Sequence, residues 1–460
     1  MSRVRRWAPL VVIWLGTIGS RQLAAQHDST AARDSQPSIK EQVEQLDQRV
    51  RILARLLELK QDSLTAAAAA TKGTARVTTG REGFTIKSAD GDFQLRLRGL
   101  VQADSRSYGG GAPALGAGTL FLRRVRPITD VTAWHYFTAR IVPDFGAGTT
   151  VLYDAYVDFR LAPQFTLRGG KAKPPVGLEQ LQSDQDLPFV ERGLPTNLVP
   201  NRDVGLQALG DFAGGALSYA AGVFDGDPDR GNVDGDVTNN KDIAARLFLQ
   251  PFVRSHRSPL QGLGFGVAGT TGIEHGTIAA TALPSYVTPG QQTMFKYRDS
   301  TTAQGRRYRV TPQAYWYVGR VGLLGEYVVS SQRVARGAAN AVLQSTAWQV
   351  EASIYLTNDH ASFGTVTPRH PFDPRAHGYG ALELSARYGE LTPDAAAFPT
   401  FATVATAATE AKAWAVDLTW RFAPAVQLGV TYEVTQFTGG VAAGNRASEH
   451  FLAARLQQAF

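Results

Sequence analysis

Cysteine is absent from all 460 residues, which excludes disulfides and every metal site built from thiolates. This absence suits a protein that crosses an oxidising compartment, where disulfides form readily. A long apolar run is also lacking after the first 25 residues, so no later segment has the length of a transmembrane helix. If the remainder enters a membrane, it must do so as a closed β-barrel, in which all backbone groups are paired.

The sequence also lacks a large excess of one charge. The formal net charge is +7, but the first 25 residues contain Arg3, Arg5, Arg6 and Arg21 and no acidic residue. The rest of the chain has 43 Lys and Arg against 40 Asp and Glu. This balance excludes the broad basic surface that binds nucleic acid, so no nucleic-acid partner is predicted.

The N-terminus has the pattern of a secretory signal peptide. Its basic start is followed by an apolar centre from Trp7 to Ile18 and by Leu23, Ala24 and Ala25. We predict residues 1–25 to be this peptide, with cleavage after Ala25. A membrane anchor is the alternative, but it needs about twenty apolar residues and this centre is shorter.

A heptad pattern follows the predicted signal peptide. Apolar residues recur in steps of three and four, which is typical of a coiled coil: Ile39, Val43, Leu46, Val50, Leu53, Leu57 and Leu64. We therefore predict a periplasmic coiled-coil segment over residues 26–65, which we expect to form trimers because so short a helix is marginal alone. The alternative is a monomeric amphipathic helix packed on the next domain. Residues 66–91 are interpreted as the end of the helix and a flexible linker.

The segment from Thr150 to Arg160 alternates cleanly between apolar and polar side chains, which predicts a strand with two different faces. The apolar face comprises Val151, Tyr153, Ala155, Val157 and Phe159. The opposite face comprises Thr150, Asp154, Tyr156, Asp158 and Arg160. A strand of this length with one apolar and one charged face is typical of a transmembrane barrel, although a half-buried strand of a soluble sandwich would look similar.

This alternating pattern recurs along the chain, which favours the barrel over the soluble sandwich. We predict sixteen strands, near 92–104, 119–131, 133–145, 149–160, 163–173, 202–212, 213–225, 239–254, 260–273, 304–319, 320–334, 343–357, 375–389, 410–423, 424–438 and 446–460. The fold class is thus all-β, a transmembrane antiparallel barrel over residues 92–460, preceded by the short coiled-coil helix. A barrel of this size leaves an aqueous channel. Connections alternate between long and short except at 146–149 and 358–375.

Charged side chains dominate the predicted inner face, which makes a transverse field that acts on ions. The early strands are the most basic, so we predict a preference for anions. The wall residues that we expect to line the pore are Arg96, Arg98, Arg124, Arg126, Arg140, Lys171, Arg246, Arg307 and Arg309.

Residues 171–193, KAKPPVGLEQLQSDQDLPFVERG, and residues 201–227, NRDVGLQALGDFAGGALSYAAGVFDGD, carry the motifs of a known family. The motif residues are Lys173, Pro174, Gly177 and Glu179, the pair Glu191 and Arg192, then Arg202 with Gly205, and finally Tyr219, Phe224, Asp225 and Gly226. FLRRVRPITDV, GALELSARY and the C-terminal Phe460 add to the match. These stretches resemble the phosphate-selective porin O and P family of bacterial outer membranes.

The resemblance implies a trimer of sixteen-stranded barrels in outer-membrane lipid, each narrowed by an inward-folded third loop, here Pro174 to Asn201. It also implies constriction residues, namely Lys173, Glu179, Glu191, Arg192 and Arg202. Phe460 would be the C-terminal signal read by the barrel assembly machinery. The loop is rich in acidic residues, and the sequence alone does not locate the converging Arg and Lys side chains that phosphate capture requires.

Other chemistries are less well supported. Asp225 to Asp236 nearly fits a calcium loop, but Arg230 occupies the position of the required glycine and Asp236 replaces the bidentate glutamate. No GxSxG or HExxH motif occurs, so we predict neither catalytic residues nor a metal or other cofactor. The alternatives to a porin are an envelope tether that acts through the coiled coil and, least favoured, an outer-membrane esterase.

Overall fold

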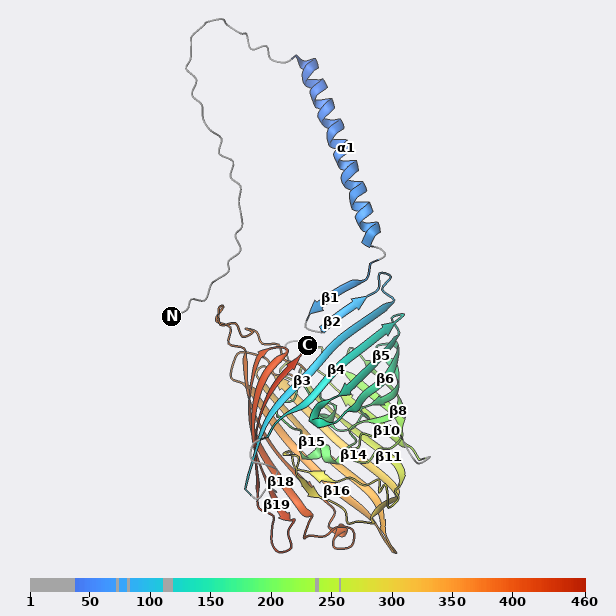
Figure 1. The fold of residues 1–460 in the computed structure, drawn as a ribbon, viewed down its shortest axis with the longest axis vertical. Coiled ribbons are helices and arrows are strands. Elements are labelled where there is room, and N and C mark those ends of the chain that lie inside the picture. Colours follow the sequence, from blue (N-terminus) through green and yellow to red (C-terminus); the bar gives the residue numbers. More distant parts are fainter. Residues whose placement is uncertain (1–37, 72–73, 81–82, 111–118, 236–239, 256–257) are drawn as a thin grey trace, which may run out of the picture. The chain divides into compact units, whose positions relative to one another are not determined.

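The computed structural model describes residues 38–71, 74–80, 83–110, 119–235, 240–255 and 258–460. The predicted signal peptide and Asp236 therefore lie outside the described residues. The chain divides into two units, with the boundary between Ala70 and Thr71. The first unit contains one helix and the second contains the barrel (Figure 1).

The second unit is a closed antiparallel barrel of sixteen strands, as the sequence predicts (Figure 1). Each strand pairs with its neighbours in chain order, and β20 pairs with β3 to close the barrel. The strands are β3 (Phe93–Gly110), β4 (Thr119–Ala133), β5 (Phe137–Asp144), β6 (Val151–Ala162), β7 (Phe165–Ala172), β8 (Asp203–Phe212), β9 (Leu217–Phe224), β10 (Asp242–Leu249), β11 (Leu263–His275), β14 (Thr302–Val318), β15 (Val321–Arg336), β16 (Ala339–Tyr355), β17 (Ala381–Thr392), β18 (Ala408–Ala423), β19 (Val426–Gly439) and β20 (Glu449–Ala459).

Short turns join the strands at one end of the barrel, and longer loops join most of them at the other. The sequence predicted two exceptions to this alternation of short and long connections, and the structure has both. They are the short connection between β5 and β6 and the long connection between β16 and β17. Two further exceptions were missed: β15 and β16 are joined by only Gly337 and Ala338, and β10 and β11 are joined by the long segment 250–262 at the end where short turns occur. Gly337 has φ +58°, a value that favours glycine and permits this tight turn.

Residues N-terminal to the barrel are more regular than the predicted linker. Helix α1 (Ile39–Thr71) begins with a capping box, in which the Ser38 amide donates to Glu41 Oε2 at 2.9 Å and the Glu41 amide donates to Ser38 Oγ at 3.3 Å. Strands β1 (Arg76–Gly80) and β2 (Gly83–Lys87) then form a hairpin, and β2 pairs with β3. The linker prediction is therefore wrong for these strands, because the hairpin satisfies its backbone groups on the free edge of β3.

Within the described part of the chain, no helix combines the length and apolar character needed to span a bilayer.

The two faces of the barrel wall differ as a membrane-spanning sheet requires. On β18, the outward residues Trp414, Val416 and Leu418 are 41–44% exposed. The inward residues that alternate with them, Asp417 and Thr419, are buried. The outer face is thus apolar and available to lipid, while the inner face is polar.

Substitution of Val416 by arginine tests the assignment of the outer face. Val416 lies at the middle of β18, so we expect Val416→Arg to lower the free energy of unfolding by about 2–4 kcal/mol, the range for a basic residue near the bilayer midplane. Denaturant unfolding of the barrel in lipid measures this change. Gln48→Arg, at an exposed position of α1 outside the heptad pattern, is the control and should leave barrel stability unaltered. Equal stability of Val416→Arg and the parent protein would contradict the lipid-facing assignment.

Three loops fold inward and share an apolar core with the wall. These are residues 173–202 with α2 (Leu178–Leu181) and the 3-10 helix η2 (Leu194–Leu198), residues 276–301 with β12 (Tyr286–Val287) and β13 (Thr293–Phe295), and residues 393–407 with the 3-10 helix η3 (Ala395–Ala397). Half of the buried wall residues in this core are alanines, including Ala244, Ala268, Ala347, Ala411 and Ala413. Small wall residues leave room for the large loop residues, so part of the lumen is filled by packed protein.

Candidate pore constriction

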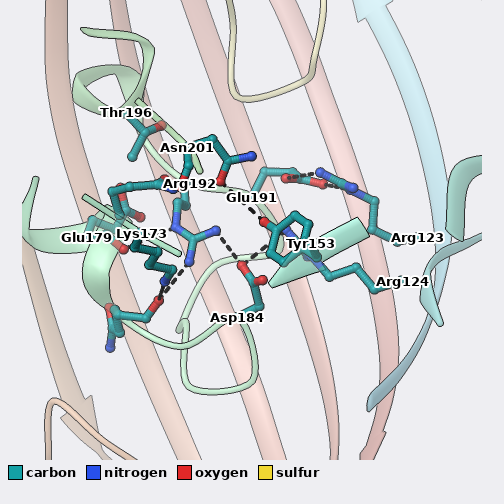
Figure 2. Close-up of polar contacts among 12 residues, drawn as sticks. Arg123, Arg124, Tyr153, Lys173, Glu179, Asp184, Glu191, Arg192, Thr196 and Asn201 are labelled. Carbon is teal, nitrogen blue, oxygen red and sulfur yellow. Dashed lines mark hydrogen bonds and ion pairs between the residues drawn. The ribbon is translucent and has the colours of Figure 1, made fainter. Parts of the chain in front are cut away.

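Loop 173–202 lies against the inner wall of the barrel, and three carboxylates anchor it there. Glu191 is the first. Its carboxylate accepts from Arg123 Nε at 2.6 Å, lies 3.4 Å from Arg455 Nη2 and pairs with Arg106 (Figure 2 shows Arg123). Burial alone would raise the pKa of Glu191, but these arginines hold that pKa well below its ordinary value. Glu191 therefore stays ionised and ties the loop to strands β3, β4 and β20.

Asp184 is the second anchor. It pairs with Arg126 from the wall and with Arg192 from its own loop, and Arg124 Nη2 lies 3.4 Å from its carboxylate (Figure 2 shows Arg124 and Arg192). Burial would raise the pKa of Asp184, but the surrounding cations, Arg124 first, hold it well below the ordinary value. One carboxylate thus gathers three guanidinium groups around it.

Glu179 is the third anchor and faces other strands. Its carboxylate lies 3.2 Å from Arg387 Nη1 on β17 and accepts from the Gln349 amide on β16 at 2.9 Å. It also accepts from the backbone amide of Gly193 at 2.9 Å, which closes the loop on itself. The acidic residues that make this loop unusual by composition are therefore each bound to basic or polar groups.

Two β-bulges turn additional side chains into the lumen. The register of β3 and β4 shifts between Gln102 and Ala103, opposite Arg123, so the consecutive residues Arg123 and Arg124 both reach loop 173–202. The register of β5 and β6 shifts in the same way opposite Tyr153. A strict period of two cannot place adjacent residues on one face, and the bulges remove that restriction.

The second bulge corrects a sequence prediction. Tyr153 and Val151 were expected on the lipid-facing side of β6, but Tyr153 donates to Asn201 in the inward loop at 3.4 Å. Its ring lies between the guanidinium groups of Arg126 and Arg202, at 3.5 and 3.9 Å from the ring centroid. Val151 lines a small inner pocket together with Tyr153. The remainder of the strand behaves as predicted, with Val157 exposed on the outside.

A cavity of about 550 Å³ lies beside the loop, between it and the wall. Seven cationic side chains line it, namely Arg98, Arg126, Arg140, Arg168, Lys173, Arg202 and Arg246, against three carboxylates, Asp154, Asp184 and Asp211. Lys173 Nζ donates to the Gln182 carbonyl at 2.8 Å. Burial, and then the neighbouring Arg202 and Arg192, lower the pKa of Lys173 well below its ordinary value. Even if Lys173 is left out because its charged form is disfavoured, six arginines line the cavity against three carboxylates, so cationic side chains are in excess in the lining.

Aspartates from the wall hold the arginines of the cavity in place. Asp130 lies 2.7 Å from Arg98 and 2.6 Å from Arg140. The same pairing occurs between Arg168 and Asp158 at 2.7 Å and between Arg202 and Asp154 at 2.6 Å. Such fixed pairs orient the guanidinium groups and compensate part of their charge, because Asp130 and Asp158 add to the three carboxylates that line the cavity.

Comparison with known proteins identifies the family. The model of the phosphate-selective porin O and P family matches residues 133–460, most of the chain. The chain belongs to this family. Family and fold together support a channel of the outer membrane rather than an enzyme.

Solved structures of other outer-membrane proteins have a fold similar to that of this porin. The outer membrane channel DcaP of Acinetobacter baumannii is 11% identical and aligns over 81% of this chain and 99% of its own, with a TM-score of 0.50. Outer-membrane expressed OmpT of Vibrio cholerae is 10% identical and aligns over 80% of this chain and 98% of its own, with a TM-score of 0.50. At this level of identity the likeness concerns the fold alone. A comparison with curated protein sequences gave no match.

The structure distributes the predicted site residues of the porin over several places. Most lie at the inward loop or the cavity: Arg98, Arg124, Arg126, Arg140, Lys173, Glu179, Glu191, Arg192, Arg202 and Arg246. Arg96 is half-buried on β3, in the part of that strand that also pairs with β2, and Lys171 pairs with Asp234. At the C-terminus, the Phe460 carbonyl accepts from the Gly99 amide at 2.7 Å, and its ring fills the space where a Gly99 side chain would stand.

Arg307 and Arg309 lie away from the cavity and hold a second inward segment, residues 225–235. Arg309 Nε donates to Asp229 at 2.5 Å, while Arg307 Nη2 lies 2.8 Å from both Asp242 and Glu274. The carboxylate of Asp229, which a calcium ion would need as a ligand, therefore binds Arg309 instead. Among the residues that the structure describes, no group of three His, Asp or Glu side chains is arranged to hold a metal.

Sequence reasoning missed several contributors to the site: Arg106, Arg123, Tyr153, Arg168 and Arg455. Arg123 offered a signal, because the pair Arg123–Arg124 within a membrane strand would place one arginine in lipid unless a bulge intervened. The others carried no comparable signal, since their partners lie far away in the chain.

Proposed function

We propose that this protein is a porin that prefers anions and admits small hydrophilic solutes through the cavity beside loop 173–202. The observation that carries the proposal is the excess of cations in that cavity. The inward loops narrow the water-filled part of the lumen, so permeating ions must pass close to these charges. Low-dielectric walls strengthen the field in such a narrow passage.

The remaining features support an assembly in the outer membrane. We propose that residues 1–25 are removed, that residues 26–65 lie in the periplasm, and that the barrel reaches its lipid through the assembly machinery, which recognises Phe460. The heptad side chains of α1 are more than half exposed in the single chain, for example Leu53 and Leu57. A parallel coiled coil would bury them, so the proposal includes a homotrimer joined through α1.

A reversal-potential measurement tests the anion preference. A lumen potential of about one kT per unit charge, or about 0.6 kcal/mol, would favour an anion over a cation about sevenfold. In a planar bilayer with a KCl gradient, we therefore expect a chloride-to-potassium permeability ratio above about three. A ratio of one or less would contradict the proposal. The intact chain purified in detergent is the material to use.

A further inference from the structure

An apolar patch interrupts the charged inner wall at the cavity. It consists of Leu100 on β3, Ile128 on β4 and Val142 on β5, all three of which line the cavity. Leu100 and Val142 are each 4% exposed, so these side chains point inward rather than toward lipid. The wall of a water-filled lumen is expected to be polar, so an apolar patch there calls for an explanation.

The inward loops do not provide that explanation. Elsewhere in the described lumen, buried apolar side chains pack into clusters with the loops, as Val176 and Leu198 do with wall alanines. Leu100, Ile128 and Val142 belong to none of the four apolar clusters found among the described residues. The patch is therefore not part of the packed loop core, and the surface that its side chains keep exposed borders the cavity.

Arginines surround the patch at fixed positions. Across β3 and β4, Arg98 pairs with Ile128 and Leu100 pairs with Arg126, so apolar and cationic side chains alternate on the two strands. Arg140 lies two residues before Val142 on the same strand, hence on the same face. Cationic and apolar groups thus lie within a few ångströms of one another.

Aromatic rings extend the apolar surface. Tyr153 and Tyr156 line the same cavity, and arginines lie over both rings, with Arg126 3.5 Å from the centroid of Tyr153 and Arg168 4.0 Å from that of Tyr156. Arg126 already donates to Asp144 and Asp184, and Arg168 to both oxygens of Asp158, so an anion would bind through the remaining N–H groups of these guanidinium groups. A ligand that uses the whole surface must combine a negative head with an apolar body.

We propose that the cavity binds organic anions with an apolar, preferably aromatic, body more tightly than small inorganic anions of equal or higher charge. The negative head pairs with Arg98, Arg126 or Arg140, and the body covers the patch of Leu100, Ile128 and Val142. Leu100 and Val142 already have little contact with water, so the apolar surface that the body removes from water belongs mainly to the half-buried Ile128 and Tyr156, which a compact anion such as phosphate cannot cover. This inference rests on the proposed anion preference of the same cavity.

Block of the chloride current by matched sulfonates tests the inference. Benzenesulfonate and methanesulfonate carry the same head and stay ionised near neutral pH, so neither crosses the bilayer as a neutral acid. For the wild-type porin, we expect benzenesulfonate to half-block the current at a concentration at least tenfold lower than methanesulfonate, and lower than inorganic phosphate. Equal half-blocking concentrations for the two sulfonates, or tighter block by phosphate, would overturn the inference.

Threonine substitutions separate apolar contact from the larger size of the aromatic anion. Val142→Thr is nearly isosteric, and the double variant Ile128→Thr with Val142→Thr makes two of the three patch residues polar at the cost of a small loss of side-chain volume at position 128. We expect the double variant to reduce the ratio between the two sulfonates at least threefold, and Val142→Thr alone to reduce it less. Val157→Thr, on the outer face, is the control and should keep the wild-type ratio. An unchanged ratio in the double variant would mean that the patch does not contact the ligand.

Failure of this inference is distinguishable from failure of the proposed function. The KCl reversal potential without sulfonates reports the anion preference alone. A chloride-selective channel that responds equally to both sulfonates keeps the proposed function and loses the inference. A channel without anion preference would contradict the proposed function, and with it the inference that rests on it.

Discussion

Replacement of Glu191 by glutamine is expected to loosen loop 173–202 from the barrel wall and to raise the single-channel conductance. Glu191 is buried and faces Arg106, Arg123 and Arg455. Without its charge, Arg106 and Arg455 keep Asp104 as a carboxylate partner, and Arg123 loses the carboxylate with which it pairs. Removal of one member of a buried charge network costs about 3–5 kcal/mol, because the remaining charges stay buried without compensation. Since about 1.4 kcal/mol is a factor of ten in an equilibrium constant, the displaced loop becomes at least about a hundredfold more populated.

Single-channel recording and limited proteolysis measure this effect together. We expect Glu191→Gln channels to switch between the wild-type level and a larger one, and proteases to cut within residues 173–202. Glu410→Gln is the matched control: Glu410 pairs with Lys412 at 3.0 Å near the start of β18, where both side chains are at least 30% exposed. Such exposed pairs contribute about 1 kcal/mol or less, so the control should behave as wild type. Conductance and noise identical to wild type in Glu191→Gln would show that Glu191 does not hold the loop.

The architecture of the barrel could be predicted because a membrane imposes a simple rule on each strand. Lipid on one side and water on the other force side chains to alternate, as Val416 and Asp417 do on β18. Sixteen repetitions of that alternation give the strand number, and the order of the strands follows from antiparallel pairing in sequence. Bulges break the rule locally, so Arg123 and Tyr153 were placed incorrectly or overlooked. A bulge is a shift in the register between two strands, and the sequence of one strand alone does not reveal that register.

The inward loop was predictable in its location but not in its contacts. The resemblance placed the inward loop between β7 and β8, and composition identified its acidic residues. The choice of partners across the lumen was hidden, because Arg106 and Glu191 are 85 residues apart and Arg455 lies near the C-terminus. The acidic residues therefore looked like an argument against anions. In the folded barrel, Asp184 and Glu191 bind arginines of the wall, and the cations lining the neighbouring cavity still exceed its carboxylates.

Replacement of Arg126 by glutamine is expected to reduce the anion preference more than any other single change in the cavity. Arg126 donates to Asp144 at 2.7 Å, pairs with Asp184 and stacks on Tyr153. Its loss removes one positive charge, so the local potential falls and the charges of Asp144 and Asp184 are less compensated. Asp184 keeps Arg124 and Arg192, and Asp144 keeps the amides of Val125 at 3.1 Å and Gly146 at 2.9 Å, so the barrel should still fold.

Reversal potentials of Arg126→Gln in a KCl gradient give the size of the effect. We expect the chloride-to-potassium permeability ratio to fall about threefold to tenfold, which corresponds to about 0.6–1.4 kcal/mol between the two ions. Arg126→Lys keeps the charge without the planar fork and should retain most of the preference, whereas Arg333→Gln, exposed near the end of β15, should retain all of it. The difference between wild type and Arg126→Gln should shrink at 1 M KCl, where the Debye length is about 3 Å instead of about 10 Å at 0.1 M. A wild-type ratio in Arg126→Gln at 0.1 M KCl would mean that permeating ions do not pass through this cavity.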